Sequence, residues 1–368
     1  MSLDTVVMAG RSRSSRPSTA TLRVARVVAV WEPGGAQLAV LRLIAALRRR
    51  GVVTTRLLVG EATSAGLELA ARHRVPVECY GDETGLQWRP SPEFASWLAP
   101  RLSHVDVVHA HMFGAWWAAA EAAPRGVPLV ASEHNEMTWP AGDFSTAASA
   151  VAPRIDAFFA HGPAALDFAA GLGLRPGVLR AGRSAVIGLD ARPLPRLPSP
   201  RITFTGRFRS DKAPDLLLRA VALLREPPMT YLVGDGPDRS RLVDLAERLG
   251  IADRVVPTGW SHAPARYVAG ASVHVVPSRE EAWSQSAVVA LGLGVPVIGT
   301  AVDGLSRTLG DGRGILVPPD DPGALAAAIE RVLAGDRPDP APGITYARTF
   351  TPARLAGHYL PVYRALIR

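Results

Sequence analysis

Short apolar runs alternate with longer helical patterns along this chain, and the alternating series occurs twice. Apolar runs of this length are typical of buried parallel strands, and the patterns between them are typical of crossover helices. Between the two series, residues 190–200 (DARPLPRLPSP) hold four prolines, which neither a helix nor a central strand tolerates. The pattern predicts an α/β protein of two Rossmann-like, doubly wound domains that face an interdomain cleft.

The same pattern predicts where the strands and the domain boundaries lie. Strands are expected at residues 25–30, 54–59, 106–111, 127–132 and 156–161, and then at 201–206, 229–234, 254–259, 272–277 and 295–300. We expect a disordered amino-terminal tail (1–22), a first domain (23–190), a linker (191–200), a second domain (201–350) and a carboxyl-terminal helix (351–368).

Composition narrows the classes of protein. The single cysteine, Cys79, rules out a disulfide within the chain and makes a cytoplasmic protein the expectation. The net charge of +8 fits either a solubilising surface or attraction to anions, but no basic stripe with interleaved aromatics predicts a nucleic-acid partner. Residues 282–302 form a long uncharged run, yet serines, glycines and a proline interrupt it, so we expect no stable membrane insertion.

Residues 277–296 carry the strongest functional signal. They combine the end of a predicted strand, a turn with two adjacent carboxylates, and a helix that begins at Ser284, Gln285 and Ser286. A helix start carries unpaired N–H groups and about half a positive charge, so it favours anions such as phosphate. Glu281 is placed to accept hydrogen bonds from a group that lies over those phosphates. The segment therefore predicts a sugar-nucleotide site.

Two cations and two glycines in the same half strengthen that prediction. Arg207 and Lys212 follow Gly206 at a strand-to-helix junction, where paired cations can neutralise a diphosphate leaving group. Gly234 follows the next strand in the tight turn GDGPD. Solvated surface charges and a plain turn would explain each feature alone, but their occurrence beside the Glu281 turn favours a site.

The first domain contributes a second group of candidates. Gly34 and Gly35 precede the first predicted helix and expose N–H groups at its start. His134 lies in a loop after a buried strand, a common position for a site residue and also for a plain surface histidine. His109 and His111 share one face of a strand, but no third ligand is evident, so we predict no metal site. No GxGxxG or Walker A motif follows a strand, which disfavours dehydrogenases and P-loop enzymes.

Together these pieces resemble the retaining glycosyltransferases of the GT-B fold, specifically family GT4 of the glycosyl transferase group 1 superfamily. The resemblance runs from about Val24 to the carboxyl terminus and is strongest over residues 205–304. The family's GR…K element is similar to Gly206, Arg207 and Lys212, and its VGDGP turn to residues 233–237. Its second E-x7-E carboxylate is replaced here by Val289, so ribose binding must be looser or use another group.

The resemblance implies a mechanism as well as a fold. Arg207, Lys212 and the helix start would stabilise the departing diphosphate, Glu281 would contact the donor sugar, His134 would lie near it, and the last helix would cross back to the first domain. An acceptor hydroxyl would attack the same face, giving retention without a metal. No cofactor is expected beyond a UDP-linked GlcNAc or glucose donor. The predicted donor-binding residues are Gly34, Gly35, Gly206, Arg207, Lys212, Gly234, Trp260, Ala282, Trp283, Ser284 and Gln285.

The acceptor is predicted from carboxylates near the cleft and from a similarity to antibiotic-pathway family members. Both suggest a small cationic aminocyclitol such as 2-deoxystreptamine. The predicted acceptor-binding residues are Glu32, Glu133, Glu136 and Asp143. Two alternatives stay open: a family enzyme with a lipid acceptor at the membrane surface, and a non-catalytic sugar-nucleotide-binding protein, which the replacement at Val289 motivates. The oligomeric state is not predicted.

Overall fold

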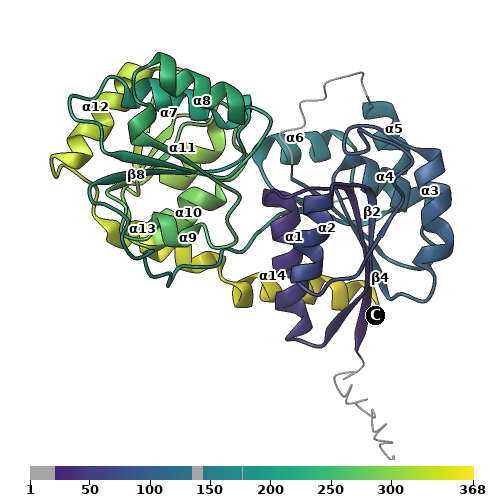
Figure 1. Cartoon of the computed structure of the whole chain (residues 1–368). Coiled ribbons are helices and arrows are strands. Elements are labelled where there is room, and N and C mark those ends of the chain that lie inside the picture. The colour runs from purple at the N-terminus through teal and green to yellow at the C-terminus, as the bar shows by residue number, and fades with distance from the viewer. Residues whose placement is uncertain (1–20, 135–143, 176) are drawn as a thin grey trace, which may run out of the picture.

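The computed structural model describes residues 21–134, 144–175 and 177–368. The strands in these ranges form two sheets, and the paired strands within each are parallel. Figure 1 shows two lobes, each built around one sheet with helices packed against it. The predicted α/β class with two doubly wound domains is therefore confirmed. Of the predicted tail, residues 1–20 lie outside the described residues, and Leu22 already belongs to the first strand.

The first sheet has the strand order β3-β2-β1-β4-β5-β6-β7. Its strands are β1 (Leu22–Trp31), β2 (Val52–Ala62), β3 (Val77–Cys79), β4 (Val107–His111), β5 (Leu129–Glu133), β6 (Ile155–Ala160) and β7 (Leu179–Ala181). The helices of this lobe are α1 (Gly35–Arg48), α2 (Ser64–Arg72), α3 (Pro92–Leu98), α4 (Phe113–Ala122), α5 (Ser145–Val151) and α6 (Pro163–Gly171), with short 3-10 turns η1 (Ala99–Leu102) and η2 (Ala152–Arg154).

The second sheet has the order β10-β9-β8-β11-β12-β13. Its strands are β8 (Arg201–Thr205), β9 (Met229–Val233), β10 (Val255–Gly259), β11 (Val273–Val276), β12 (Val297–Thr300) and β13 (Ile315–Val317). The remaining helices are α7 (Pro214–Val221), α8 (Arg239–Arg248), α9 (Ala265–Val268), α10 (Gln285–Gly292), α11 (Asp303–Leu309), α12 (Pro322–Leu333), α13 (Pro340–Ala347) and α14 (Pro352–Leu366), with 3-10 turns η3 (Ser210–Lys212), η4 (Ala252–Arg254) and η5 (Arg348–Phe350).

The strand order reverses once in each sheet, and the two reversals position the site. In the first sheet the order turns between β1 and β4, and in the second between β8 and β11. Ligands of open α/β sheets bind at such switch points, beyond the carboxyl ends of the strands. The connections that leave β1, β8 and β11 hold residues 32–34, 206–213 and 277–284, which include most of the predicted donor site.

Three strands were not predicted from the sequence. β3, β7 and β13 have three residues each and lie at sheet edges, and most of their side chains are partly or fully exposed. A short edge strand needs no continuous apolar run, because one of its sides faces no neighbouring strand. The periodicity that identifies central strands is therefore absent from these segments.

Two segments of the chain cross between the lobes. Residues 182–200, which include the prolines of the predicted linker, are free of helix and strand, and residues 347–352 form the return crossing. The N–H of Val186 donates to the carbonyl of Phe350 at 2.9 Å, so the crossings lie side by side. Val186, Val288 and Ala347 form a small buried apolar cluster there.

Helix α14 packs on the first lobe although it follows the second in sequence, and Figure 1 shows it in yellow along the base of the first lobe. Its apolar positions recur at helical spacing, and Leu355, Tyr359 and Tyr363 are buried against β1 and α1. The Tyr363 hydroxyl accepts a hydrogen bond from the fully buried Arg26 of β1 at 3.2 Å. The carboxyl terminus of the chain therefore completes the core of the first domain.

Candidate active site

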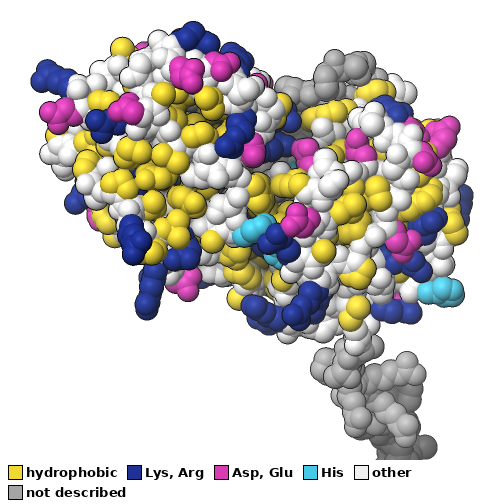
Figure 2. All heavy atoms as spheres, in the orientation of Figure 1, with side chains coloured by type: hydrophobic (Ala, Val, Ile, Leu, Met, Phe, Trp, Pro, Cys, Tyr) yellow, Lys and Arg dark blue, Asp and Glu magenta, His cyan; other side chains and the backbone are white. Residues whose placement is uncertain are grey.

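A cavity of about 1120 Å³ lies between the two lobes. Its walls come from the start of α1 and the ends of β5 and β6 in the first lobe, and from the connections after β8, β10 and β11 in the second. Basic, acidic and histidine side chains gather where the lobes meet (Figure 2). All of the residues predicted to bind the donor line this one cavity: Gly34, Gly35, Gly206, Arg207, Lys212, Gly234, Trp260, Ala282, Trp283, Ser284 and Gln285.

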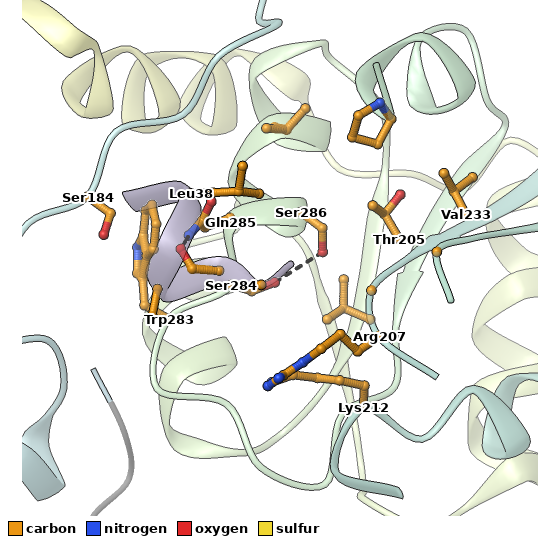
Figure 3. A pocket seen from close by; sticks show the side chains of 18 of the residues that line it. Leu38, Ser184, Thr205, Arg207, Lys212, Val233, Trp283, Ser284, Gln285 and Ser286 are labelled. Carbon is orange, nitrogen blue, oxygen red and sulfur yellow. Dashed lines mark hydrogen bonds between the residues drawn. The ribbon is translucent and has the colours of Figure 1, made fainter. Parts of the chain in front are cut away.

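Arg207 and Lys212 reach the cavity from the connection between β8 and α7. Gly206 follows the last residue of β8, and η3 brings Lys212 back beside Arg207. Figure 3 shows the two side chains side by side, with their charged ends pointing the same way past the turn at Ser284. Because both cations come from one short connection, local backbone geometry sets their spacing. Such a pair can stabilise negative charge that develops on a leaving group.

The carboxylate of Glu281 is held by two neighbours. The Lys212 Nζ lies 3.1 Å from Oε2 of Glu281, and it also donates to the carbonyl of Glu280 at 3.2 Å. The Ser278 hydroxyl donates to the same Glu281 oxygen at 3.4 Å. An ionised carboxylate accepts about four hydrogen bonds, so Glu281 keeps capacity for the hydroxyl groups of a ligand.

Helix α10 starts at the cavity. Ser284 is its N-cap, and its hydroxyl accepts a hydrogen bond from the N–H of Ala287 at 3.3 Å. The N–H groups of the first helical turn have no partners within the helix and carry its positive dipole end. Both the helix start and the two cations therefore favour a bound anion in this wall of the cavity.

Two glycines permit close backbone approaches beside these groups. Gly234 has a φ of +147°, and a Cβ there would lie 1.9 Å from the carbonyl oxygen of Gly206. Gly35 opens α1, and its carbonyl accepts a hydrogen bond from Nε2 of Gln285 at 2.7 Å. The start of α1 and the start of α10 thus touch across the gap between the domains.

Glu32 occupies a different place from the one expected. Its Oε1 accepts a hydrogen bond from Nη1 of Arg207 at 2.6 Å, which makes the two side chains an ion pair, and both are 34% exposed. Glu32 is not among the residues that line the cavity. This placement corrects the expectation that Glu32 faces an acceptor: the carboxylate bridges the domains and balances the positive charge of Arg207.

The predicted position of Glu133 at the acceptor site also differs from its position in the structure. Its side chain is fully buried, and its carboxylate accepts hydrogen bonds from Trp116 Nε1 at 3.2 Å and from the N–H of His134 at 2.9 Å. A carboxylate held in the core cannot meet an acceptor in the cleft, so this prediction is wrong for Glu133. The other two predicted acceptor carboxylates, Glu136 and Asp143, lie outside the described residues.

Four histidines form a stack that leads from the core to the cavity. The ring centroids of His109 and His111 are 4.1 Å apart, and those of His134 and His161 are 4.0 Å apart. Nδ1 of His111 and Nε2 of His134 lie 3.1 Å apart, within hydrogen-bond distance. Burial lowers the pKa of His134 to about 4 and depresses the pKa of the other three. His134 and His161 therefore line the cavity as neutral rings, which suit neutral hydroxyl groups.

His161 and Arg42 are two of the cavity residues that the sequence prediction did not name. His161 follows β6 and lies within hydrogen-bond distance, 3.3 Å, of the Tyr359 hydroxyl in α14. Arg42 lies on α1, seven residues after Gly35, and this spacing places both on one helix face. That spacing was a signal available in the sequence. His161 ends the strand predicted at residues 156–161, so it had the same strand-end signal that made His134 a candidate.

The described residues were also compared with the requirements of a metal site and of a membrane-spanning helix. Among the described residues, no three or more His, Cys, Asp or Glu side chains are arranged to hold a metal ion. Over the same residues, each helix is too short or too polar to cross a bilayer.

Two family models match the two halves of the chain. The model described as "Glycosyltransferase Family 4" matches residues 33–182, and the one described as "Glycosyl transferases group 1" matches residues 199–335. The chain belongs to the group 1, family 4 glycosyltransferases. The two matches lie on either side of the crossing segment, so one covers most of the first sheet and the other covers the second sheet.

Curated relatives of this family 4 chain include D-inositol 3-phosphate glycosyltransferases. The protein from Mycolicibacterium gilvum is 40% identical over 167 residues, which cover 43% of this chain and 36% of the relative. The protein from Salinispora tropica is 38% identical over 181 residues, which cover 44% of this chain and 37% of the relative. The matched stretches thus span little more than a third of the length of these relatives.

Solved structures share the fold of the family 4 chain over nearly its whole length. HepE from Anabaena, in complex with UDP and glucose, has a TM-score of 0.74 at 18% identity and covers 94% of this chain and 100% of its own. Sucrose-phosphate synthase from Thermosynechococcus elongatus has a TM-score of 0.73 at 21% identity and covers 94% and 99%. At these identities the similarity establishes the fold.

Proposed function

We propose that this protein transfers a hexose from a UDP-linked donor to a hydroxyl group of a small polar acceptor, with retention of anomeric configuration and without a metal. The observation that carries the proposal is the convergence of Arg207, Lys212, Glu281 and the start of α10 on one interdomain cavity. Cations and a helix start suit a diphosphate, and a carboxylate beside them suits the hydroxyl groups of a sugar.

In the proposed reaction, the bond between the anomeric carbon and the diphosphate oxygen breaks while the acceptor oxygen bonds to the same carbon from the same face. Arg207, Lys212 and the N–H groups at the start of α10 stabilise the charge that develops on the diphosphate. The acceptor proton passes to the leaving phosphate oxygen, so atoms and charge balance without an enzyme nucleophile. Glu281 holds the hexose, and the neutral His134 and His161 face it from the first domain.

The acceptor we propose is a hydroxylated six-membered carbon ring. The amino acid sequence favours an aminocyclitol such as 2-deoxystreptamine, and the relatives named for D-inositol 3-phosphate favour a cyclitol. Glu32 and Glu133 do not support a cationic acceptor, because one pairs with Arg207 and the other is buried. A lipid acceptor finds no specific support in the described residues.

Turnover with defined substrates tests the proposal. The protein is incubated with UDP-GlcNAc or UDP-glucose and, separately, 2-deoxystreptamine or D-inositol 3-phosphate, with and without EDTA. Mass spectrometry detects the product, and NMR assigns its anomeric configuration. We expect a retained linkage that survives EDTA. Folded protein that binds no UDP in calorimetry would refute the donor, while UDP binding with no transfer to any cyclitol would refute the acceptor class.

Binding without catalysis is the remaining alternative, and Val289 motivates it. This residue lines the cavity and offers no hydrogen bond where the resemblance places a ribose-binding carboxylate. Release of UDP at a rate that depends on acceptor concentration would eliminate a purely binding role.

A further inference from the structure

Arg42 is the most unusual charged residue in the cavity wall. It lies about two turns into α1, and both of its hydrogen bonds start from a single nitrogen, Nη1. That atom donates to the carbonyl of Ala185 at 2.8 Å and to the side-chain oxygen of Gln285. The Nε N–H is buried without a partner among the described residues. The guanidinium therefore touches both domains and the crossing segment, but only through neutral acceptors.

Among the described residues, no negative charge balances that of Arg42. Over the described residues no carboxylate forms an ion pair with it, whereas Arg207 pairs with Glu32 and Lys212 with Glu281. Burial lowers the pKa of Arg42 to about 10, so the side chain still carries its charge at neutral pH. An enclosed charge without a counter-charge is unfavourable, and proteins seldom keep one without a use for it.

The neighbouring helix makes the isolated charge still less favourable. Gln285, the partner of Arg42, is the first residue of α10. The start of a helix carries positive charge, and cations are stabilised near the opposite end. Arg42 and the start of α10 therefore raise the positive potential between them, and a bound anion would relieve both.

We propose that Arg42 is an anion-binding residue of the cleft, which supplies a first-domain cation to a phosphate group of the ligand. The inference rests on the proposed function for the identity of that ligand. Two sources carry the same chemistry: the diphosphate of the donor and a phosphate on the acceptor. In either case the ligand binds to α1 and α10 together, so Arg42 couples ligand binding to the contact between the domains.

Calorimetry with four probes tests the proposal: UDP, inorganic pyrophosphate, uridine and D-inositol 3-phosphate. Arg42→Met removes the charge and keeps the length of the side chain, and Arg42→Lys keeps the charge. Arg49→Met, at the exposed end of α1, is the matched control. We expect Arg42→Met to weaken UDP and pyrophosphate binding about tenfold or more, Arg42→Lys to recover part of the loss, and uridine binding to stay unchanged.

The probes also separate the two sources of phosphate. Loss of affinity for UDP and pyrophosphate identifies the donor diphosphate, and loss for D-inositol 3-phosphate alone identifies an acceptor phosphate. Either result supports the proposal. Unchanged affinity for every anion, or an equal loss for uridine and UDP, overturns it, because the second pattern is that of a residue that only holds the domains together. Circular dichroism and the melting temperature confirm that each variant is folded.

Failure of this inference and failure of the proposed function give different results. If the wild type transfers sugar and Arg42→Met binds UDP normally, the function stands and the inference fails. If the wild type binds pyrophosphate through Arg42 but transfers no sugar to any acceptor, the anion site stands and the proposed function fails.

Discussion

The two walls of the cleft differ in charge. The second-domain wall presents Arg207, Lys212 and Glu281, and each has a charged partner within 3.1 Å. The first-domain wall presents the neutral rings of His134 and His161 together with the unpaired charge of Arg42. Among the described residues, the second-domain wall therefore presents paired charges, while the first-domain wall offers neutral hydrogen-bonding rings and, at Arg42, a cation without a carboxylate partner.

The largest expected effect is a difference between the two domains in how much stability each loses as the pH falls. Burial depresses the pKa of all four stacked histidines of the first domain, whereas the second domain has one comparable residue, His274, with a pKa of about 3. The unfolded chain binds protons below about pH 6.5 and the folded chain does so only at lower pH, so stability falls as pH falls from 6.5 toward 4. Each histidine contributes up to about 1.4 kcal/mol per pH unit.

Hydrogen exchange measures this contrast strand by strand. Between about pH 7.5 and 5.5, after correction for intrinsic exchange, protection of β4, β5 and β6 should fall further than that of β8, β9 and β11. His111→Gln should lessen the difference, and substitution of the exposed His104 by Asn should leave it unchanged. An equal loss of protection in both sheets would contradict the assignment of acid sensitivity to the first domain.

Removing one cation from the second-domain wall should have the next largest effect. Lys212→Ala deletes a charge that we propose stabilises the leaving diphosphate, and it also releases Glu281, so we expect kcat to fall about a hundredfold or more. Because the side chain lies at the cavity and not in the core, the melting temperature should change little. Arg241→Ala, on the exposed face of α8, is the matched control. Wild-type turnover by the Lys212 variant would refute the role.

Substitution of two glutamates of the first domain should lower the free energy of unfolding by different amounts. Glu133→Ala leaves Trp116 Nε1 and a main-chain N–H without their buried acceptor, so it should lower the free energy of unfolding by about 1–3 kcal/mol. Glu32→Ala breaks an ion pair that is one-third exposed, so it should cost less than about 1 kcal/mol. Urea denaturation followed by tryptophan fluorescence compares them. Equal costs would show that burial is not what distinguishes them.

The smallest expected effect concerns the ion pair that joins the two walls. Glu32→Gln removes the partner of Arg207, which then becomes available to a bound diphosphate. The affinity for UDP should rise by a factor of up to about five, the equivalent of one exposed ion pair. Calorimetry at low and at high salt gives the value. Weaker UDP binding in this variant would instead show that Glu32 orients Arg207 toward the ligand.

What the sequence predicted follows from how local each feature is. The central strands are continuous apolar runs, and Arg207 with Lys212 lie on one short connection, so both could be read from neighbouring residues. Which residues form the first-domain wall depends on the side of the sheet toward which each side chain points. Glu133 is the last residue of β5 and is buried, whereas His134, the next residue, lines the cavity; neighbouring side chains of an extended chain take opposite sides.

The remaining failures have a different physical origin. His161 reaches the cavity only because β6 lies beside β5, and Tyr359 meets it only because α14 returns to the first lobe. The strand-end position of His161 could be read from the sequence, but no local pattern shows which strands and helices become its neighbours. The short strands β3, β7 and β13 escaped because an edge strand of three residues shows no apolar period.

The pair of crossing segments restricts how this molecule can move. Bodies tethered at two adjacent points can swing about the line that joins the tethers, but they cannot slide or twist freely past each other. Here the two crossing segments are joined by the hydrogen bond from Val186 to Phe350. The neighbouring carbonyl of Ala185 accepts a hydrogen bond from Arg42. If the lobes move apart, their separation is therefore smallest beside the crossing segments and largest at the opposite edge of the cleft. Arg42 lies beside the crossing segments, so its position relative to the two domains changes least.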